Sequence, residues 1–188
     1  MSKVCKTCRT RFHPEPPGAV TCGAECAESF AVSKRGKAEK VKAIKEKKET
    51  KEALNKLKSK GKLIAEAQTA FNAFIRARDT GMPCICCGRE MGPQRPGGSI
   101  DAGHYLSRGS SAHLSFDERN VHAQRKDCNR PGGAKRAQFR AGMINRIGLV
   151  ELEALECDQV SRHYSKDDYL QIKQTYNAKA RALLKAIK

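Results

Sequence analysis

Apolar residues recur at helical spacing in three stretches of the chain, and these stretches predict its main helices. Residues 63–79 carry one apolar stripe, residues 137–147 carry a second, and a third follows Ser165. The first stripe consists of Ile64, Ala67, Phe71, Phe74 and Ile75. Ser165 and Asp168 have the spacing of a capping box, which marks the start of a helix. Such stripes are typical of helices that pack on a core, so we assign them no functional role.

A strand-like run lies between the first two stripes and completes the predicted fold class. It extends from Ile100 to Leu106 and follows a stretch of turn-forming Gly and Pro residues. Helices combined with a short strand region indicate an α+β fold. We expect four segments: an N-terminal module at 1–30, a basic helical arm at 31–62, a core with its preceding helix at 63–150, and a C-terminal helical segment at 151–188.

The expected arm carries a dense positive charge. Residues 34–62 contain 13 Lys or Arg and 4 Glu, a local net charge of +9, without a continuous apolar stripe. Such a segment is a solvated, partly helical linker or an arm that lies along phosphates, and the two interpretations are compatible. The whole chain has 37 Lys or Arg and 20 Asp or Glu, a net charge of +17 that points to a polyanionic partner such as nucleic acid.

The apolar pattern argues against a membrane or secreted protein. No apolar run approaches the roughly 18 residues of a membrane span. The first residues, MSKVCKTC, contain no apolar segment for export. We therefore expect a cytoplasmic protein that does not bind membranes. Thiols stay reduced in the cytoplasm, so closely spaced cysteines favour metal binding over disulfides.

The N-terminal module has four cysteines with the spacing of a zinc site. Cys5 and Cys8 form one pair and Cys22 and Cys26 another, joined by a connection rich in Pro and Gly. A segment of this length buries too little apolar surface to fold alone. Four thiolates around a tetrahedral zinc ion would supply the missing stability. We predict a structural zinc here, with His13 as a neighbour rather than a ligand.

A second cysteine group brackets the part of the chain with candidate chemistry. If a zinc ion ties Cys84 and Cys87 to Cys128, the intervening residues must fold back as a compact hairpin. The polar residues of this region are Asp101, His104, Asn120, His122 and Asn129. Hydrolysis of a phosphodiester needs a base, and His, with an ordinary pKa of about 6.5, is suited to that task. It also needs a hard cation such as Mg²⁺, which prefers oxygen ligands. The set is therefore typical of a metal-dependent nuclease.

Several strings in the chain carry a family resemblance. They are FHP at 12–14 with its flanking cysteines, NAFIRARDTGMPCICCG at 72–88, DAGHY at 101–105, FDERNVHAQ at 116–124, CN at 128–129 and INRIG at 144–148. On these strings the chain resembles the NinG (Rap) recombination endonucleases of lambda-type bacteriophages, which belong to the HNH, or ββα-metal, nuclease superfamily. The resemblance covers nearly the whole chain. It implies a zinc-stabilised ββα-metal core and a structure-specific endonuclease that uses Mg²⁺ or Mn²⁺ to cut branched DNA such as Holliday junctions and D-loops.

The resemblance also implies roles for individual residues. His104 falls at the position of the general base, and Asn129 falls where such folds place a ligand of the catalytic cation. Asn120 matches the Asn that holds the hairpin and the base in place. Gly103 stands where many members have a metal ligand, and Asp101, two residues earlier on the same strand face, is the expected substitute. His122 is a zinc ligand, a site residue or a packing residue.

Two departures from the family pattern keep other interpretations open. Arg125 stands where the family usually has a Cys, so a second zinc must recruit Cys86 or His122, or lose a ligand. Pro131 stands where a His is common. The alternatives are a non-catalytic zinc protein that binds branched DNA or a recombination partner, and a zinc-ribbon adaptor. A four-way junction needs paired cuts, so a homodimer is one expected assembly, although the sequence shows no dimer interface.

Overall fold

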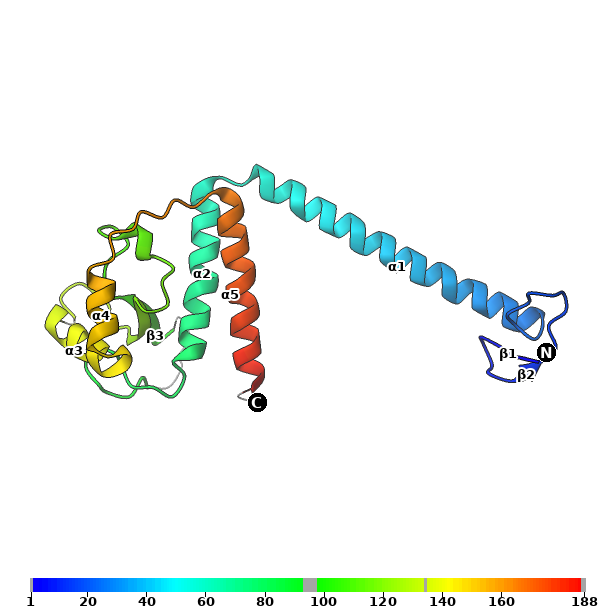
Figure 1. Ribbon diagram of the computed structural model, residues 1–188, viewed down its shortest axis with the longest axis horizontal. Coiled ribbons are helices and arrows are strands. Elements are labelled where there is room, and N and C mark those ends of the chain that lie inside the picture. Colours follow the sequence, from blue (N-terminus) through cyan, green and yellow to red (C-terminus); the bar gives the residue numbers. More distant parts are fainter. Residues whose placement is uncertain (1, 93–97, 134, 187–188) are drawn as a thin grey trace. The chain divides into compact units, whose positions relative to one another are not determined.

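The chain forms two compact units, each described here by itself. The computed structural model describes residues 2–92, 98–133 and 135–186. The first unit, Met1–Lys58, contains β1 (Lys3–Val4), β2 (Arg11–Phe12) and α1 (Ala24–Leu57). The second unit, Ser59–Lys188, contains α2 (Lys60–Arg78), β3 (Ile100–His104), the 3-10 helix η1 (Ala112–Leu114), β4 (Val121–Arg125), α3 (Arg136–Ile147), α4 (Leu149–Glu156) and α5 (Lys166–Ala186) (Figure 1). Helices with two small sheets confirm the expected α+β class.

The first unit consists of a small cysteine-containing module and one long helix. Strands β1 and β2 pair antiparallel, with Lys3 opposite Phe12. Helix α1 then runs without interruption from Ala24, so the expected boundary between 1–30 and 31–62 falls inside a helix. None of its residues is buried. Its sequence is rich in Ala, Glu and Lys, which favour helix without packing, and pairs such as Lys42–Glu46, 3.9 Å apart, add weak support.

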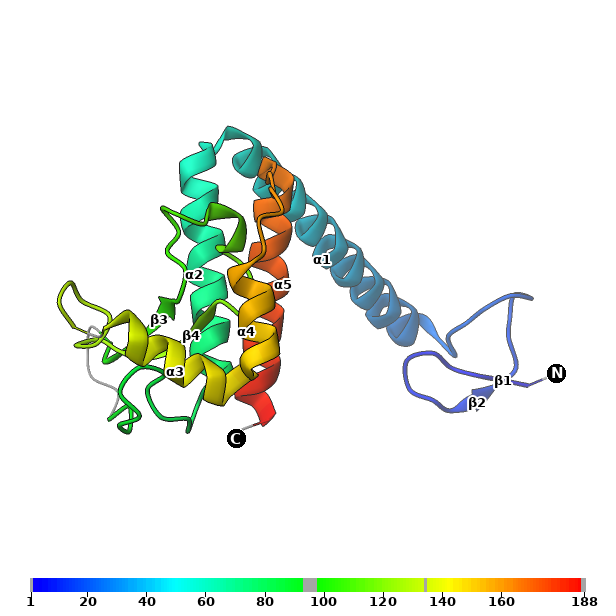
Figure 2. The ribbon, with the colours of Figure 1, turned by 60° about the vertical axis from the view of Figure 1, so that its left-hand side comes forward.

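Helices α2 and α5 form the framework of the second unit. They lie side by side in both ribbon views (Figures 1 and 2). Ser59 caps α2 by accepting a hydrogen bond from the Lys62 amide, 3.3 Å away. Ser165 and Asp168 form the expected capping box at the start of α5. The apolar stripe expected at 63–79 is confirmed, because α2 buries Phe71, Phe74 and Ile75 against its neighbours.

Strands β3 and β4 form an antiparallel hairpin that packs on α2. Ala102 lies opposite Ala123, Gly103 opposite His122, and His104 opposite Val121. Ala102 and Val121 enter the same apolar cluster as Phe71 of α2. Because side chains alternate along a strand, His104 shares the Ala102 face while Asp101 and Gly103 lie on the other.

Helices α3 and α4 cover a second apolar cluster next to the hairpin. The cluster contains Cys84, Ile85, Leu114, Phe139, Met143, Leu152 and Leu155. Gly142 allows α3 to approach the turn that carries Cys84, because a Cβ at this position would overlap the Ile85 carbonyl oxygen. Strands β3 and β4 and helix α3 follow one another in the order of a ββα unit, but residues 126–133 form turns, so α3 begins only at Arg136. Helix α4 crosses the expected boundary at 150.

None of the helices within the described ranges combines the length and the apolar character that crossing a bilayer requires.

Candidate functional site

The four N-terminal cysteines converge on one point. Their sulfur atoms all lie within 4.8 Å of one another. Cys5 and Cys8 come from the connection between β1 and β2, Cys22 precedes α1, and Cys26 lies on its first turn. Burial acts to raise the pKa of the Cys5 thiol, but backbone N–H groups of Cys8, Thr7 and Cys22 outweigh it and lower the pKa to about 6. Four converging thiols have the donor set of a structural zinc site, and His13 is not among the converging groups.

A second cluster contains Cys84, Cys87 and Cys128, whose sulfur atoms also lie within 4.8 Å of one another. Cys84 and Cys87 belong to a turn in which the Gly88 amide donates to the Cys84 carbonyl oxygen. Cys128 belongs to the turn after β4. This group could bind zinc with three thiolates, and it joins the two ends of the hairpin region.

His122, for which a zinc ligand, a site residue and a packing residue were all expected roles, does not belong to this second cluster. Its side chain is 3% exposed, and both ring nitrogens are engaged. Nε2 lies 3.0 Å from the carbonyl oxygen of Arg119, and Nδ1 lies 3.0 Å from Nη2 of Arg78. Because a metal ligand needs a free nitrogen lone pair, His122 is a packing residue here.

A buried carboxylate fixes the hairpin to the surrounding helices. Asp79, at the end of α2, pairs with Arg78 at 2.7 Å and accepts a hydrogen bond from the Ala123 amide at 2.7 Å. Arg146 of α3 lies 3.6 Å from the same carboxylate. Burial alone would raise the pKa of Asp79, but its contacts with His122, Arg78 and the Ala123 amide outweigh it and lower the pKa below its ordinary value. The ionised carboxylate thus connects α2, β4 and α3.

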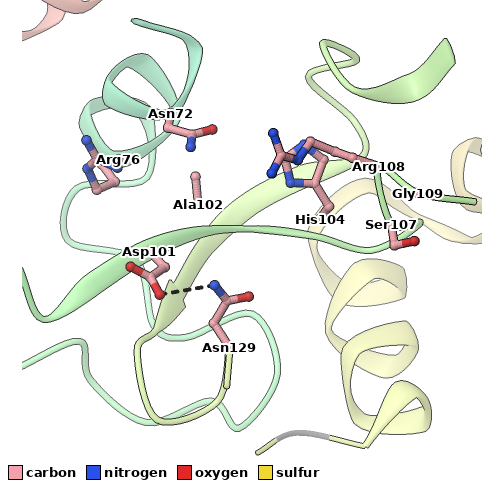
Figure 3. Close-up of a pocket in the computed structure, with 9 residues that line it drawn as sticks. All are labelled: Asn72, Arg76, Asp101, Ala102, His104, Ser107, Arg108, Gly109 and Asn129. Carbon is pink, nitrogen blue, oxygen red and sulfur yellow. Dashed lines mark hydrogen bonds between the residues drawn. The ribbon is translucent and has the colours of Figure 1, made fainter. Parts of the chain in front are cut away.

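An open polar cleft of about 570 Å³ lies over β3 (Figure 3). Asp101 and His104 come from β3, Asn129 from the turn after β4, and Arg108 from the loop that follows β3. Asn72 and Arg76 line it from α2. The side chains of Asp101 and Asn129 meet, with Asn129 Nδ2 donating to Asp101 Oδ2 at 3.0 Å. The structure therefore brings three of the sequence-predicted residues, Asp101, His104 and Asn129, to one cavity.

The tautomer of His104 follows from its hydrogen bond. Nε2 lies 3.2 Å from the carbonyl oxygen of Ser115, and a carbonyl can only accept, so Nε2 carries the proton. Nδ1 is then the basic nitrogen. Burial, followed by the charge of Arg108, lowers the pKa of His104, although the hydrogen bond to Ser115 acts in the opposite direction. The imidazole is therefore neutral at physiological pH.

Asn120 lies beneath the cleft rather than in it. It is fully buried and holds the loop between the two strands. Its Oδ1 accepts from the Leu106 amide at 2.8 Å, and its Nδ2 donates to the carbonyls of Leu106 and Leu114 at 3.0 and 3.1 Å. Leu106 follows His104 by two residues, so Asn120 fixes the backbone that carries the imidazole.

The sequence alone did not point to four polar residues of the cleft: Asn72, Arg76, Ser107 and Arg108. Asn72 and Arg76 are four residues apart on α2, on the side away from its buried stripe, and they carry no motif recognisable without the fold. The only available signal was their position inside the NAFIR string. Arg76 and Arg108 give the cleft two guanidinium groups, and Asp101 gives it a single carboxylate.

The fold and the two clusters define a basic α+β protein with cysteine sites suited to metal ions and a polar, arginine-lined cleft. The family model described as Bacteriophage Lambda NinG protein matches residues 1–186, and the chain belongs to this family. Protein ninG of Salmonella phage P22 is 34% identical over 192 residues, covering 95% of this chain and 92% of the relative. Protein ninG of Escherichia phage lambda is 33% identical over 192 residues, with the same coverage. No solved structure matches the chain. The expected family is thus confirmed.

Proposed function

We propose that this chain is a metal-dependent endonuclease of the HNH type that cuts branched DNA, with the cleft over β3 as its active site. The observation that carries this proposal is the meeting of His104, Asp101 and Asn129 in one open, basic cavity. A neutral imidazole can serve as a general base, and a carboxylate and an amide oxygen can hold a divalent cation.

His104 acts as the general base in this proposal. Its Nδ1 is free to accept a proton because Nε2 is held by the Ser115 carbonyl. The lowered pKa keeps the ring neutral at pH 7, so the base does not need to lose a proton before it acts. Nδ1 takes the proton of a water molecule as the water oxygen attacks phosphorus. The P–O bond to one sugar oxygen breaks, and that oxygen leaves with the electron pair and is protonated by solvent.

Asp101 and Asn129 are the residues that would hold the catalytic cation. Their side chains already touch, and the amide of Asn129 can be turned to present its oxygen beside the Asp101 carboxylate. Two oxygen donors suit Mg²⁺ or Mn²⁺, which keep several water ligands. A divalent cation supplies positive charge to the phosphate oxygens as negative charge accumulates on them.

The arginines of the cleft position the DNA backbone. Arg76 and Arg108 line the cavity from α2 and from the loop after β3. Guanidinium groups bind phosphate oxygens bidentately without reading base sequence. The net charge of +17 and the absence of Trp support recognition of backbone shape rather than stacking on single strands. The preference for branched DNA rests on the family resemblance.

The test is cleavage of a labelled four-way junction beside a linear duplex of matched sequence, in Mg²⁺, Mn²⁺ or EDTA. We expect metal-dependent cutting of the junction that is lost in Asp101→Asn and Asn129→Ala. Asn145→Ala is the matched control, because Asn145 is exposed and lies outside this cleft.

A non-catalytic role in binding branched DNA is the second candidate. It is favoured by the turns at 126–133, which separate Asn129 from α3, so that this Asn lies on a loop rather than a helix. Junction binding without cutting in any metal would support this candidate and overturn the nuclease proposal.

A further inference from the structure

The second cysteine cluster has three ligands where a closed structural zinc site has four. Among the His, Cys, Asp and Glu side chains that the structure describes, only Cys84, Cys87 and Cys128 meet within 4.8 Å at this place. His122 is engaged through both ring nitrogens. The Asp127 carboxylate is paired with Arg125 at 3.1 Å and with Arg89 at 3.2 Å.

Cys86 is the remaining thiol beside the cluster. It lies in the turn between Cys84 and Cys87 and is 7% exposed. It packs in the same buried cluster as Cys84 and Cys128, against which Cys87 also packs. Its sulfur lies outside the 4.8 Å grouping of the other three and contacts Gln124 of β4, so metal binding would turn the Cys86 side chain toward them.

The hydrogen bonds at Cys86 resemble those at the cluster sulfurs. The Arg125 amide donates to Cys84 Sγ at 3.3 Å, and Arg89 Nε donates to Cys87 Sγ at 3.4 Å. Gln124 Nε2 donates to Cys86 Sγ at 2.8 Å. A neutral thiol is a weak acceptor, whereas ligands of a metal ion are characteristically held by outer hydrogen bonds. The donor from Gln124 is thus the kind of partner that a thiolate ligand needs.

Gly103 makes this arrangement of Gln124 sterically possible. A Cβ at Gly103 would overlap the Oε1 atom of Gln124. That oxygen is buried and has no hydrogen-bond partner within the described part of the chain. The unpaired Oε1 of Gln124 therefore costs some stability. In this position Gln124 gains the hydrogen bond from its Nε2 to Cys86 Sγ.

We propose that Cys86 is the fourth ligand of a zinc ion held by Cys84, Cys87 and Cys128. Cys86 then supplies the fourth thiolate, because Arg125 stands at the position where the family usually has a Cys. The site is a closed tetrathiolate, structural rather than catalytic, and Gln124 orients its fourth ligand. This assignment is independent of the nuclease proposal.

The test uses the full chain, reduced and loaded with Co²⁺, whose sulfur-to-metal absorption grows with the number of thiolate ligands. Zinc release to a competing chelator is measured in parallel. The wild-type chain should bind two ions, and Cys86→Ser should lose the absorption of one thiolate. Its second zinc should be released at least about tenfold more readily, because loss of a residue that merely orients a ligand already weakens metal binding by roughly 10- to 100-fold.

Two further variants make the result decisive. Cys157→Ser removes an exposed thiol outside both clusters and should match wild type. Arg125→Cys combined with Cys86→Ser places a thiol beside Cys84 and should restore the four-thiolate spectrum, even if Cys86→Ser alone fails to fold. The proposal is overturned if Cys86→Ser shows the spectrum and zinc release of Cys157→Ser, or if the double variant restores neither.

Discussion

Asn120 provides the sharpest test of how the hairpin is held, because the Asn120→Ala substitution removes three hydrogen bonds at once. The side chain is fully buried and satisfies the N–H and C=O of Leu106 and the C=O of Leu114. Each buried polar group left without a partner costs about 1–3 kcal/mol. Leu106 is only half-buried and water can reach part of it, so we expect a total loss of about 2–4 kcal/mol.

Urea unfolding followed by tyrosine fluorescence measures this loss. The chain has no Trp, and its four tyrosines are Tyr105, Tyr164, Tyr169 and Tyr176, all in the second unit. The signal therefore reports the unit that contains Asn120 and is silent on the first. With a urea dependence of about 2 kcal/mol per M, the midpoint should fall by about 1–2 M.

The matched control is Asn145→Ala, an exposed position where surface substitutions change stability by no more than about 0.5 kcal/mol. At temperatures where Asn120→Ala remains folded, junction cleavage should also slow, because the backbone after His104 is no longer fixed. A midpoint equal to that of Asn145→Ala would refute the argument that Asn120 fixes the hairpin.

Three further predictions follow from the site. Because burial lowers the pKa of His104 and the base must be neutral, the cleavage rate should rise with pH to a plateau, with a midpoint below about 6.5; a midpoint above 7 would contradict the assigned base. Asp79→Asn should cost about 3–5 kcal/mol in urea unfolding, because it removes the buried carboxylate that pairs with the partly buried guanidinium groups of Arg78 and Arg146. Because the pKa of Asp79 is lowered in the folded state, its carboxylate stabilises the wild type above about pH 4, and this stabilisation is lost on acidification. If the free energy of unfolding of Asp79→Asn fell equally steeply with acid, this assignment would be contradicted. DNA binding in EDTA should weaken steeply with salt, and Arg76→Ala and Arg108→Ala should each reduce the slope of log affinity against log salt by about 1. Arg181→Ala, at an exposed position of α5, should leave the slope nearly unchanged.

The sequence predicted the elements whose signal is local. The apolar stripes of α2 and α5 and the capping box at Ser165 are periodic or short-range features, and the structure places helices there. The convergence of Cys5, Cys8, Cys22 and Cys26 followed from spacing. The full length of α1 did not, because it has no apolar face and depends on helix propensity along its exposed sequence.

The polar interactions of the second unit could not be predicted from the sequence, because most of them join residues that lie far apart in the chain. In the sequence His122 could be a zinc ligand, a site residue or a packing residue, and its partner Arg78 lies on α2, which only the fold brings to it. The contribution of Arg76 to the cleft required knowing how α2 packs on β3. The link from Gly103 through Gln124 to Cys86 likewise has no spacing pattern that a linear sequence reveals.

The most direct test of the central claim is the rate of four-way junction cleavage by His104→Ala in Mg²⁺, at equal zinc content and equal DNA occupancy. The matched control is His163→Ala, which removes an exposed imidazole outside the cleft. The account predicts that His104→Ala loses about 10²- to 10⁴-fold in rate while it still binds the junction, and that His163→Ala cuts like wild type. Cutting by His104→Ala at the wild-type rate, or no cutting by the wild-type chain in any divalent metal, would contradict it.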